Sequence, residues 1–185
     1  HRRSRSPMTT VPTVDDLVGE LRRAWAHTDA LWLDLDPDEV AWRPHEQSSA
    51  IGWHLGHQAA VAHYMVRNLL AAEPSPDAEL DSLMDSATPE ASRGDLPGID
   101  RLRRYRTAVA DRVIARVDAV ATGAVGAPDQ LLVVAGGVVR ALVNHEYQHD
   151  QWIGEVRSRD LGRARPDPPA SPNLTVIDGY TVLRP

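Results

Sequence analysis

Two histidines stand four residues apart in the stretch HEYQHDQW, and this spacing suits metal chemistry. Residues i and i+4 of an α-helix share a face, so the imidazoles of His145 and His149 could converge on one ion. Both histidines also belong to an apolar stripe with alternating spacings of four and three: Val138, Leu142, His145, His149, Trp152 and Val156. Neutral imidazole binds Zn, Fe or Ni well, and an ion would satisfy two imidazoles that the stripe places in the core.

A structural interpretation of the pair stays open, because two core histidines can also hydrogen-bond to carboxylates or backbone. A second histidine-bearing segment, WHLGHQAAVAH, favours the metal, since bundle metal sites take ligands from facing helices. On a helical wheel, His54 lies near the centre of the apolar arc. His57 lies toward the edge of that arc, beside Trp53 and Tyr64, so the wheel leaves both histidines as candidate ligands. His63 points away, and we expect it at the surface.

Hydrophobic periodicity predicts the helices that position these residues. The first covers about 13–35 with Thr13 as N-cap, and the second covers about 49–72 with Ser48 and Ser49 as caps. The third covers about 99–121. The fourth ends near residue 160, and its start is open because 130–137 (QLLVVAGG) fits a short strand or a helix weakened by glycine. Four amphipathic helices predict an all-α fold, an antiparallel four-helix bundle.

The connections between these helices differ in length. Residues 36–47 break the periodicity and predict a loop, and residues 73–98 are Pro-rich and acidic, with a short helix expected near 76–86. So long a connection in a compact domain is usually functional or mobile. Glu146 and Asp150 flank the histidine pair, and their polar tips could orient the imidazoles, but we expect both on a solvated helix face.

The C-terminal part of the chain has a different character. A stiff Pro-rich stretch precedes LTVIDGYTVL, residues 174–183, which predicts a β-hairpin with a type I′ turn at Asp178-Gly179. We therefore expect a bundle over 8–162 followed by a linker and hairpin tail over 163–185. Residues 1–7 precede Met8 and are taken as a non-native or upstream remnant.

Composition excludes several functions. The chain has 185 residues, a formal charge of −6 and no cysteine, which rules out disulfides and thiolate ligands. No basic block follows the first residues, and no apolar run approaches the ~18–20 residues that span a bilayer, so we expect neither a nucleic-acid nor a membrane partner. Without a signal-peptide core we expect a cytoplasmic protein. Apolar helix faces left uncovered would favour a homodimer.

AIGWHLGHQ, followed much later by HEYQHDQWIGEVRSRDLG, resembles the DinB superfamily of YfiT-like metal-dependent enzymes. LDPDEVAWRP is similar to that family's loop, and the resemblance covers roughly 13–162. It implies a DinB-like four-helix bundle in which His57, His145 and His149 bind one divalent metal. It also implies that His54 is a neighbour of these ligands or an alternative one. Gln151 matches a glutamine that the family usually carries two places after its last ligand.

The resemblance implies an enzyme acting on a small-molecule substrate: a transferase or isomerase dependent on a low-molecular-weight thiol such as mycothiol, or a hydrolase. Trp53 and Tyr64 would line the pocket at the open metal position. The N-terminal domain of ergothioneine-forming sulfoxide synthases also resembles WHLGH and HEYQH, which implies a non-haem iron enzyme that uses oxygen. Those enzymes carry an acid in place of Gln151 and add a large catalytic domain. We therefore expect that residues 1–185 alone do not carry out sulfoxide synthesis. A non-catalytic metal-binding bundle is the third interpretation.

Overall fold

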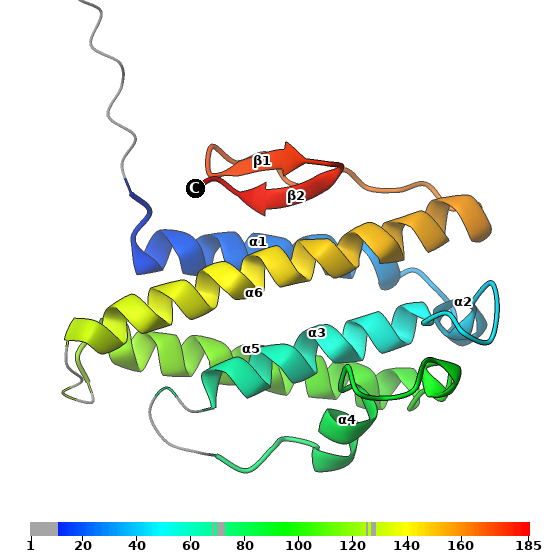
Figure 1. Ribbon diagram of the computed structural model, residues 1–185, viewed down its shortest axis with the longest axis horizontal. Coiled ribbons are helices and arrows are strands. Elements are labelled where there is room, and N and C mark those ends of the chain that lie inside the picture. Colours follow the sequence, from blue (N-terminus) through cyan, green and yellow to red (C-terminus); the bar gives the residue numbers. More distant parts are fainter. Residues whose placement is uncertain (1–10, 68, 70–72, 125, 127–128) are drawn as a thin grey trace, which may run out of the picture.

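Four long helices form the body of the protein (Figure 1). The computed structural model describes residues 11–185 except 68, 70–72, 125 and 127–128. The long helices are α1 (Val14–Trp32), α3 (Ile51–Val66), α5 (Ile99–Ala121) and α6 (Asp129–Glu155). Helices α1 and α6 run in one direction and α3 and α5 in the other, so the two pairs are antiparallel to each other (Figure 1). The predicted helical bundle with a C-terminal β-hairpin is confirmed.

The parallel course of α3 and α5 explains the long connection between them, which has to return along the bundle before α5 begins. It carries α4 (Ala78–Leu83) and the 3-10 helix η1 (Glu90–Ser92). Arg101 donates from Nε and Nη2 to the two carboxylate oxygens of Asp77, each at 2.8 Å, and Arg43 donates to the carbonyls of Glu90 and Ala91. The described part of this connection is therefore tied to α5 and to the segment before α3.

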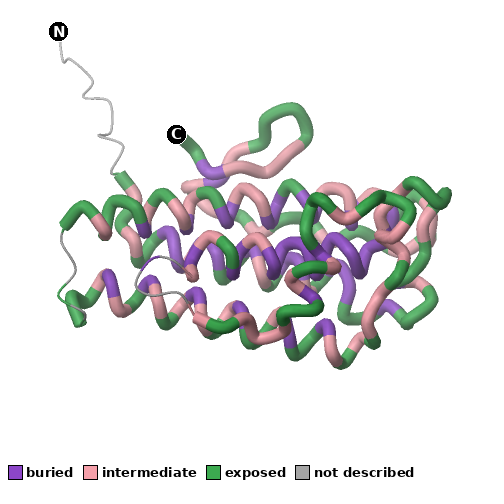
Figure 2. The backbone as a smooth tube through the Cα atoms, turned by 60° about the horizontal axis from the view of Figure 1, so that its bottom comes forward, coloured by how far each residue is buried: buried purple, intermediate pink, exposed green. Residues whose placement is uncertain are grey.

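The buried stripes of α1 and α5 follow the predicted spacing (Figure 2). Thr13 caps α1 and forms a capping box with Asp16, as the polar start of that helix predicts. The buried residues of α5 recur at spacings of three and four: Leu102, Tyr105, Val109, Val113, Val117 and Val120. Apolar burial at 3–4 spacing thus sets the rotation of both helices toward the core.

Two of these predictions were wrong, and one open alternative is resolved. Helix α3 begins at Ile51 with Ala50 as N-cap, because the Ser48 hydroxyl donates to the His45 carbonyl and closes a turn there instead. The predicted loop 36–47 contains α2 (Pro37–Ala41), which Asp36 caps. Residues 130–137 are helical, and α6 is extended by the π-helical turn η2 (Val156–Asp160). The predicted end of the second helix lies partly outside the described residues.

The hairpin consists of β1 (Leu174–Ile177) and β2 (Tyr180–Leu183), paired from Leu174↔Leu183 to Ile177↔Tyr180. Asp178 and Gly179 both have positive φ, 52° and 85°, as a type I′ turn requires, so this prediction is confirmed. The tail lies against α1 and α6: the Leu183 amide donates to Asn144 Oδ1 at 2.8 Å, and Ser171 donates to buried Glu20.

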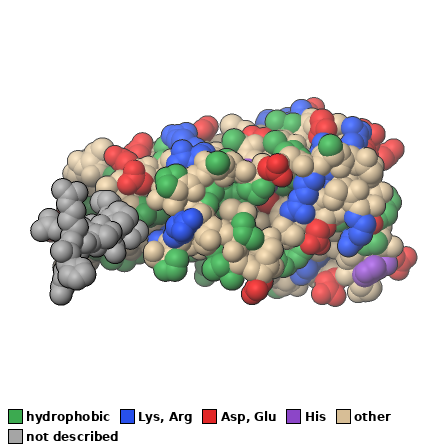
Figure 3. Space-filling view, turned by 90° about the horizontal axis from the view of Figure 1, so that it is seen from above, with side chains coloured by type: hydrophobic (Ala, Val, Ile, Leu, Met, Phe, Trp, Pro, Cys, Tyr) green, Lys and Arg blue, Asp and Glu red, His purple; other side chains and the backbone are tan. Residues whose placement is uncertain are grey.

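One face of the molecule carries side chains of mixed character (Figure 3). On the face seen in Figure 3, hydrophobic side chains are scattered among acidic and basic ones, and no patch of one charge dominates. In the part of the chain that the structure describes, no helix is long and apolar enough to cross a membrane.

Candidate metal centre

The three histidines that the family resemblance implies as ligands lie together between α3 and α6. Ring centroids are 5.2 Å apart for His57 and His145, 4.8 Å for His57 and His149, and 4.5 Å for the α6 pair. One ring nitrogen from each histidine lies within 4.8 Å of the other two. A tetrahedral ion needs its nitrogen ligands ~3.3 Å apart, so small side-chain rotations would close the site around an ion.

The orientation of His57 is set by a backbone carbonyl. Its Nδ1 lies 2.7 Å from the carbonyl oxygen of Met84, which can only accept, so Nδ1 carries the proton and Nε2 keeps its lone pair. Met84 reaches this position because residue 56 is glycine: a Cβ there would lie 2.5 Å from the Met84 sulfur. The glycine in WHLGH therefore helps to orient the neighbouring histidine.

His54 contacts the cluster through His149. The two Nδ1 atoms are 2.8 Å apart, so one ring donates to the other. When His149 donates from Nδ1, its Nε2 is left free to bind an ion, and His54 accepts. His54 thus stands behind one member of the cluster, whereas the group of three that could share an ion contains His57.

Burial favours the neutral form of these imidazoles. Desolvation lowers the pKa of His54 to about 3 and the pKa of His145 to about 4, and it also lowers the pKa of His149. Neighbouring histidines add to the effect, because a second charge in the cluster would be repelled. A neutral imidazole is the form that binds a metal, so the cluster is already in the state that an ion needs.

Aromatic rings and one cation frame the cluster. Trp53 is stacked on His57, with centroids 4.6 Å apart and planes inclined by 11°, and Trp152 meets His149 edge-on at 4.9 Å. The Arg93 guanidinium lies 4.1 Å from the Trp53 ring centroid, and since His57 occupies one face of the indole, Arg93 must occupy the other. Arg93 donates to the carbonyls of Ser86 and Thr88.

A cavity of about 910 Å³ opens between α3 and the α4 segment. Of the three clustered histidines, His57 lines it, together with Tyr64, which is 64% exposed, and residues from α4 onward. Trp53 is 3% exposed and flanks His57 without lining this cavity. His63, expected at the surface, is also in the cavity wall and only 2% exposed, so that prediction was wrong. Its Nε2 accepts from Arg112 on α5, a contact that a wheel of α3 alone cannot show.

Glu146 and Asp150 are buried, 3% and 2% exposed, so the prediction of a solvated face was wrong. They face polar groups that the other three long helices bury: Thr28, Gln58 and Arg106. Burial and the charge of Glu146 raise the pKa of Asp150 well above its usual value. The Thr28 hydroxyl lies 2.8 Å from Glu146 Oε1 and 2.7 Å from Asp150 Oδ1 but has one proton, which fits a protonated Asp150 that donates to Thr28.

Gln151 is directed elsewhere. Its side-chain oxygen accepts from Arg165 of the tail at 2.6 Å, and its nitrogen donates to Glu155 at 3.1 Å. These hydrogen bonds join α6 to the tail and do not involve the histidine cluster.

The residues present fit a divalent ion of intermediate softness. The cluster in the described residues consists of three imidazoles without a carboxylate, a donor set that suits Zn, Fe or Ni better than Mg or Ca. Three protein ligands leave coordination positions open for water or substrate, which is the pattern of catalytic rather than structural sites.

Comparison with known proteins places the chain in a family. A search of curated proteins gives no match. A family model described as the DinB superfamily matches residues 20–153, which is more than half of the chain and includes all three clustered histidines. The chain belongs to the DinB superfamily.

Proposed function

We propose that this protein is a metal-dependent enzyme that binds one divalent ion through His57, His145 and His149 and acts on a small molecule. The observation that carries the proposal is the cluster itself: three imidazoles whose nitrogens lie within 4.8 Å of one another, one of them oriented by the Met84 carbonyl. An oriented, neutral imidazole is characteristic of metal ligands.

The chemistry follows from the donor set. A divalent ion held by neutral ligands keeps its charge, and it can lower the pKa of a bound water or thiol or polarise a carbonyl. The chain has no cysteine, so a reacting thiol would come from a low-molecular-weight cofactor such as mycothiol, used in a transfer or isomerisation in the cytoplasm. The Arg93 charge beside Trp53 further favours an anionic group at the centre.

Metal content tests the ligand assignment. We expect about one Zn, Fe or Ni per chain in the purified protein, and loss of the metal in His145→Ala/His149→Ala. His45→Ala is the matched control, because His45 is exposed and lies outside the cluster. Full metal content in the double variant would refute the assignment. Iron as the native metal would instead favour an oxygen-using enzyme related to the sulfoxide synthases.

The third ligand is tested by a pair of variants. His57→Ala should abolish metal binding, whereas His54→Ala should weaken it by roughly 10–100-fold, as expected for a residue that hydrogen-bonds to a ligand. The reverse order of effects would make His54 the ligand.

Cobalt substitution tests whether the centre accepts a substrate group. The absorption bands of bound Co(II) should shift when a small thiol or carboxylate is added, because an anionic group would enter an open position. Unchanged bands with every thiol and acid, in protein whose site is shown to be filled, would favour a non-catalytic metal-binding bundle.

A further inference from the structure

Thr28, Gln58, Arg106, Glu146 and Asp150 form a connected polar cluster inside the bundle, here called the polar clasp. It takes Thr28 from α1, Gln58 from α3, Arg106 from α5 and both acids from α6. Arg106 donates to Gln58 Oε1 and to Glu146 Oε1, each at 3.0 Å. Gln58 donates to the Glu146 carbonyl at 3.0 Å and to Asp150 Oδ1 at 2.9 Å. All four long helices are thus joined at one level.

Each clasp residue of α3 and α6 directly follows a histidine of the cluster. Gln58 follows His57, and the two acids follow His145 and His149 in the same way. Successive residues of a helix point about 100° apart, so the clasp and the histidines occupy neighbouring faces of the same helical turns. Fixing the clasp therefore fixes the direction in which all three histidine side chains leave their helices.

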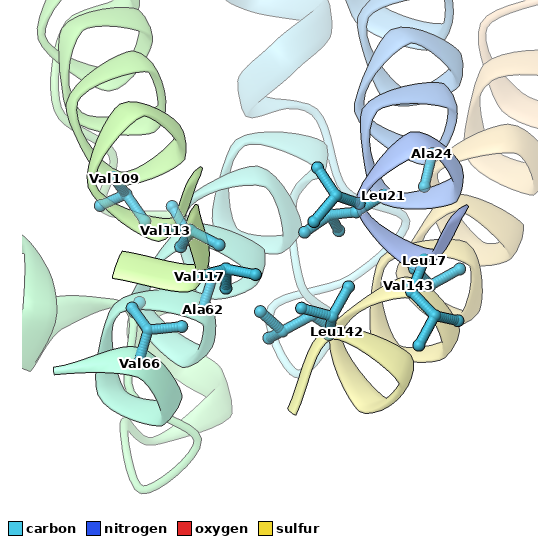
Figure 4. Packing of buried hydrophobic residues seen from close by; sticks show 14 of the residues in the cluster. Leu17, Leu21, Ala24, Ala62, Val66, Val109, Val113, Val117, Leu142 and Val143 are labelled. Atoms are coloured by element: carbon cyan, nitrogen blue, oxygen red, sulfur yellow. The ribbon is translucent and has the colours of Figure 1, made fainter. Parts of the chain in front are cut away.

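Apolar packing alone does not fix that direction closely. The neighbouring core consists of small aliphatic side chains from four helices, including Ala62, Val113, Val117, Leu142 and Val143 (Figure 4). Such contacts are non-directional, and apolar cores lose a unique, rigid arrangement before they lose stability. A rotation of α6 by ~20° would move a side-chain tip ~2 Å, given a helix radius of ~5–6 Å, whereas metal–nitrogen distances tolerate about 0.2 Å.

We propose that the polar clasp is the positioning device of the histidine cluster, holding α6 in the one rotation at which His145 and His149 face His57. This inference rests on the proposed metal site. A buried ionic cluster often adds little to stability compared with apolar side chains of the same shape, and its best-attested use is to select one arrangement among several. The clasp residues are positioning residues and do not bind the ion.

The test removes one hydroxyl. Thr28→Val keeps the shape of a side chain that is fully buried and bonded to both acids. We expect its affinity for Zn, measured by competition with a chelator, to fall roughly 10-fold or more. Thr28→Ser, which restores the hydroxyl, should restore the affinity. Val139→Ala, a destabilising change at a fully buried site of α6 outside the clasp, should leave the affinity of the folded protein within about 2-fold.

Wild-type Zn affinity in folded Thr28→Val, or an equal loss in Val139→Ala, would overturn the proposal. Gln58→Leu is the second variant if Thr28→Val does not fold, with the same expectation. Histidine ring NMR of the metal-free protein distinguishes failure of the positioning proposal from failure of the proposed metal site. Wild-type protein should show the His54–His149 hydrogen bond, and Thr28→Val should lose it. Retention of that bond would overturn the proposal even in a protein that binds no metal.

Discussion

At the scale of single residues, the short motif WHLGH carries more than its histidines. Gly56 lets Met84 pack against α3, and the Met84 carbonyl then orients the His57 ring. The sequence predicted the three clustered histidines through a family resemblance, but the wheel could not choose between His54 and His57. The wheel fails here because the residues that decide between His54 and His57, namely Met84 and His149, come from segments distant in sequence.

Gly56→Ala should weaken both the fold and the metal site. The new methyl would lie 2.5 Å from the Met84 sulfur, and such overpacking costs about 1–3 kcal/mol of unfolding free energy, which the gain in helix propensity of about 0.5–1 kcal/mol only partly offsets. Displacement of Met84 should also lower Zn affinity. The matched control is Gly137→Ala in α6, where a Cβ meets nothing within 4 Å, so a gain of about 0.5–1 kcal/mol is expected. Equal stability and affinity in the two variants would contradict this account.

Buried His27 makes stability depend on pH. Desolvation lowers its pKa to about 4, with a smaller contribution from Arg165. Between pH 6.5 and about 4 the unfolded chain binds a proton that the folded chain does not, so stability is present above pH 6.5 and is lost as the pH falls. We expect His27→Gln to reduce the acid loss of metal-free protein by up to ~3 kcal/mol. Denaturant titrations at pH 7 and pH 4.5 measure this loss, and an equal loss of stability in the wild type and in His27→Gln would refute the expectation.

At the scale of elements, hydrophobic periodicity predicted the buried faces of helices that pack apolar side chains against the core. It failed where the buried side chains are polar and have their partners on other helices. The periodicity of α1 and α5 was predicted correctly because the buried apolar residues of each helix lie on one side of it. Glu146 and Asp150 were misplaced because their partners come from three other helices. Residues 130–137 were ambiguous because apolar residues and two glycines suit a strand or a helix.

The α4 segment acts as a wall of the cavity, and its attachment to α5 can be tested. Arg101 binds Asp77, the N-cap of α4, through two hydrogen bonds and also reaches Glu79. We expect Arg101→Gln to raise amide hydrogen exchange over Ala78–Leu83, because the cap loses its charged partner. Arg22→Gln on α1, an exposed arginine, is the control. Unchanged exchange in α4 would show that apolar contacts alone hold the wall.

At the scale of the whole molecule, the bundle leaves apolar side chains exposed near the start of α6 and on the hairpin. Leu132, Val133 and Val134 are 38%, 77% and 52% exposed, and Val176 and Ile177 are 65% and 53% exposed. We propose that the protein is a homodimer that covers part of this surface. Light scattering should then give about twice the 20.3 kDa of one chain, with Val133→Glu shifting the mass toward the monomer. A wild-type mass of one chain would reject the dimer.

Anomalous diffraction at the absorption edge of the bound metal tests whether His57, His145 and His149 together hold one ion. We expect one strong peak per chain between α3 and α6, with nitrogen ligands at ~2.0–2.1 Å from all three histidines if the metal is zinc. We also expect the His57 Nδ1 bond to Met84 to persist in that crystal. A peak bound by His54 in place of His57, or no peak in metal-saturated protein, would show that the ligand assignment is wrong.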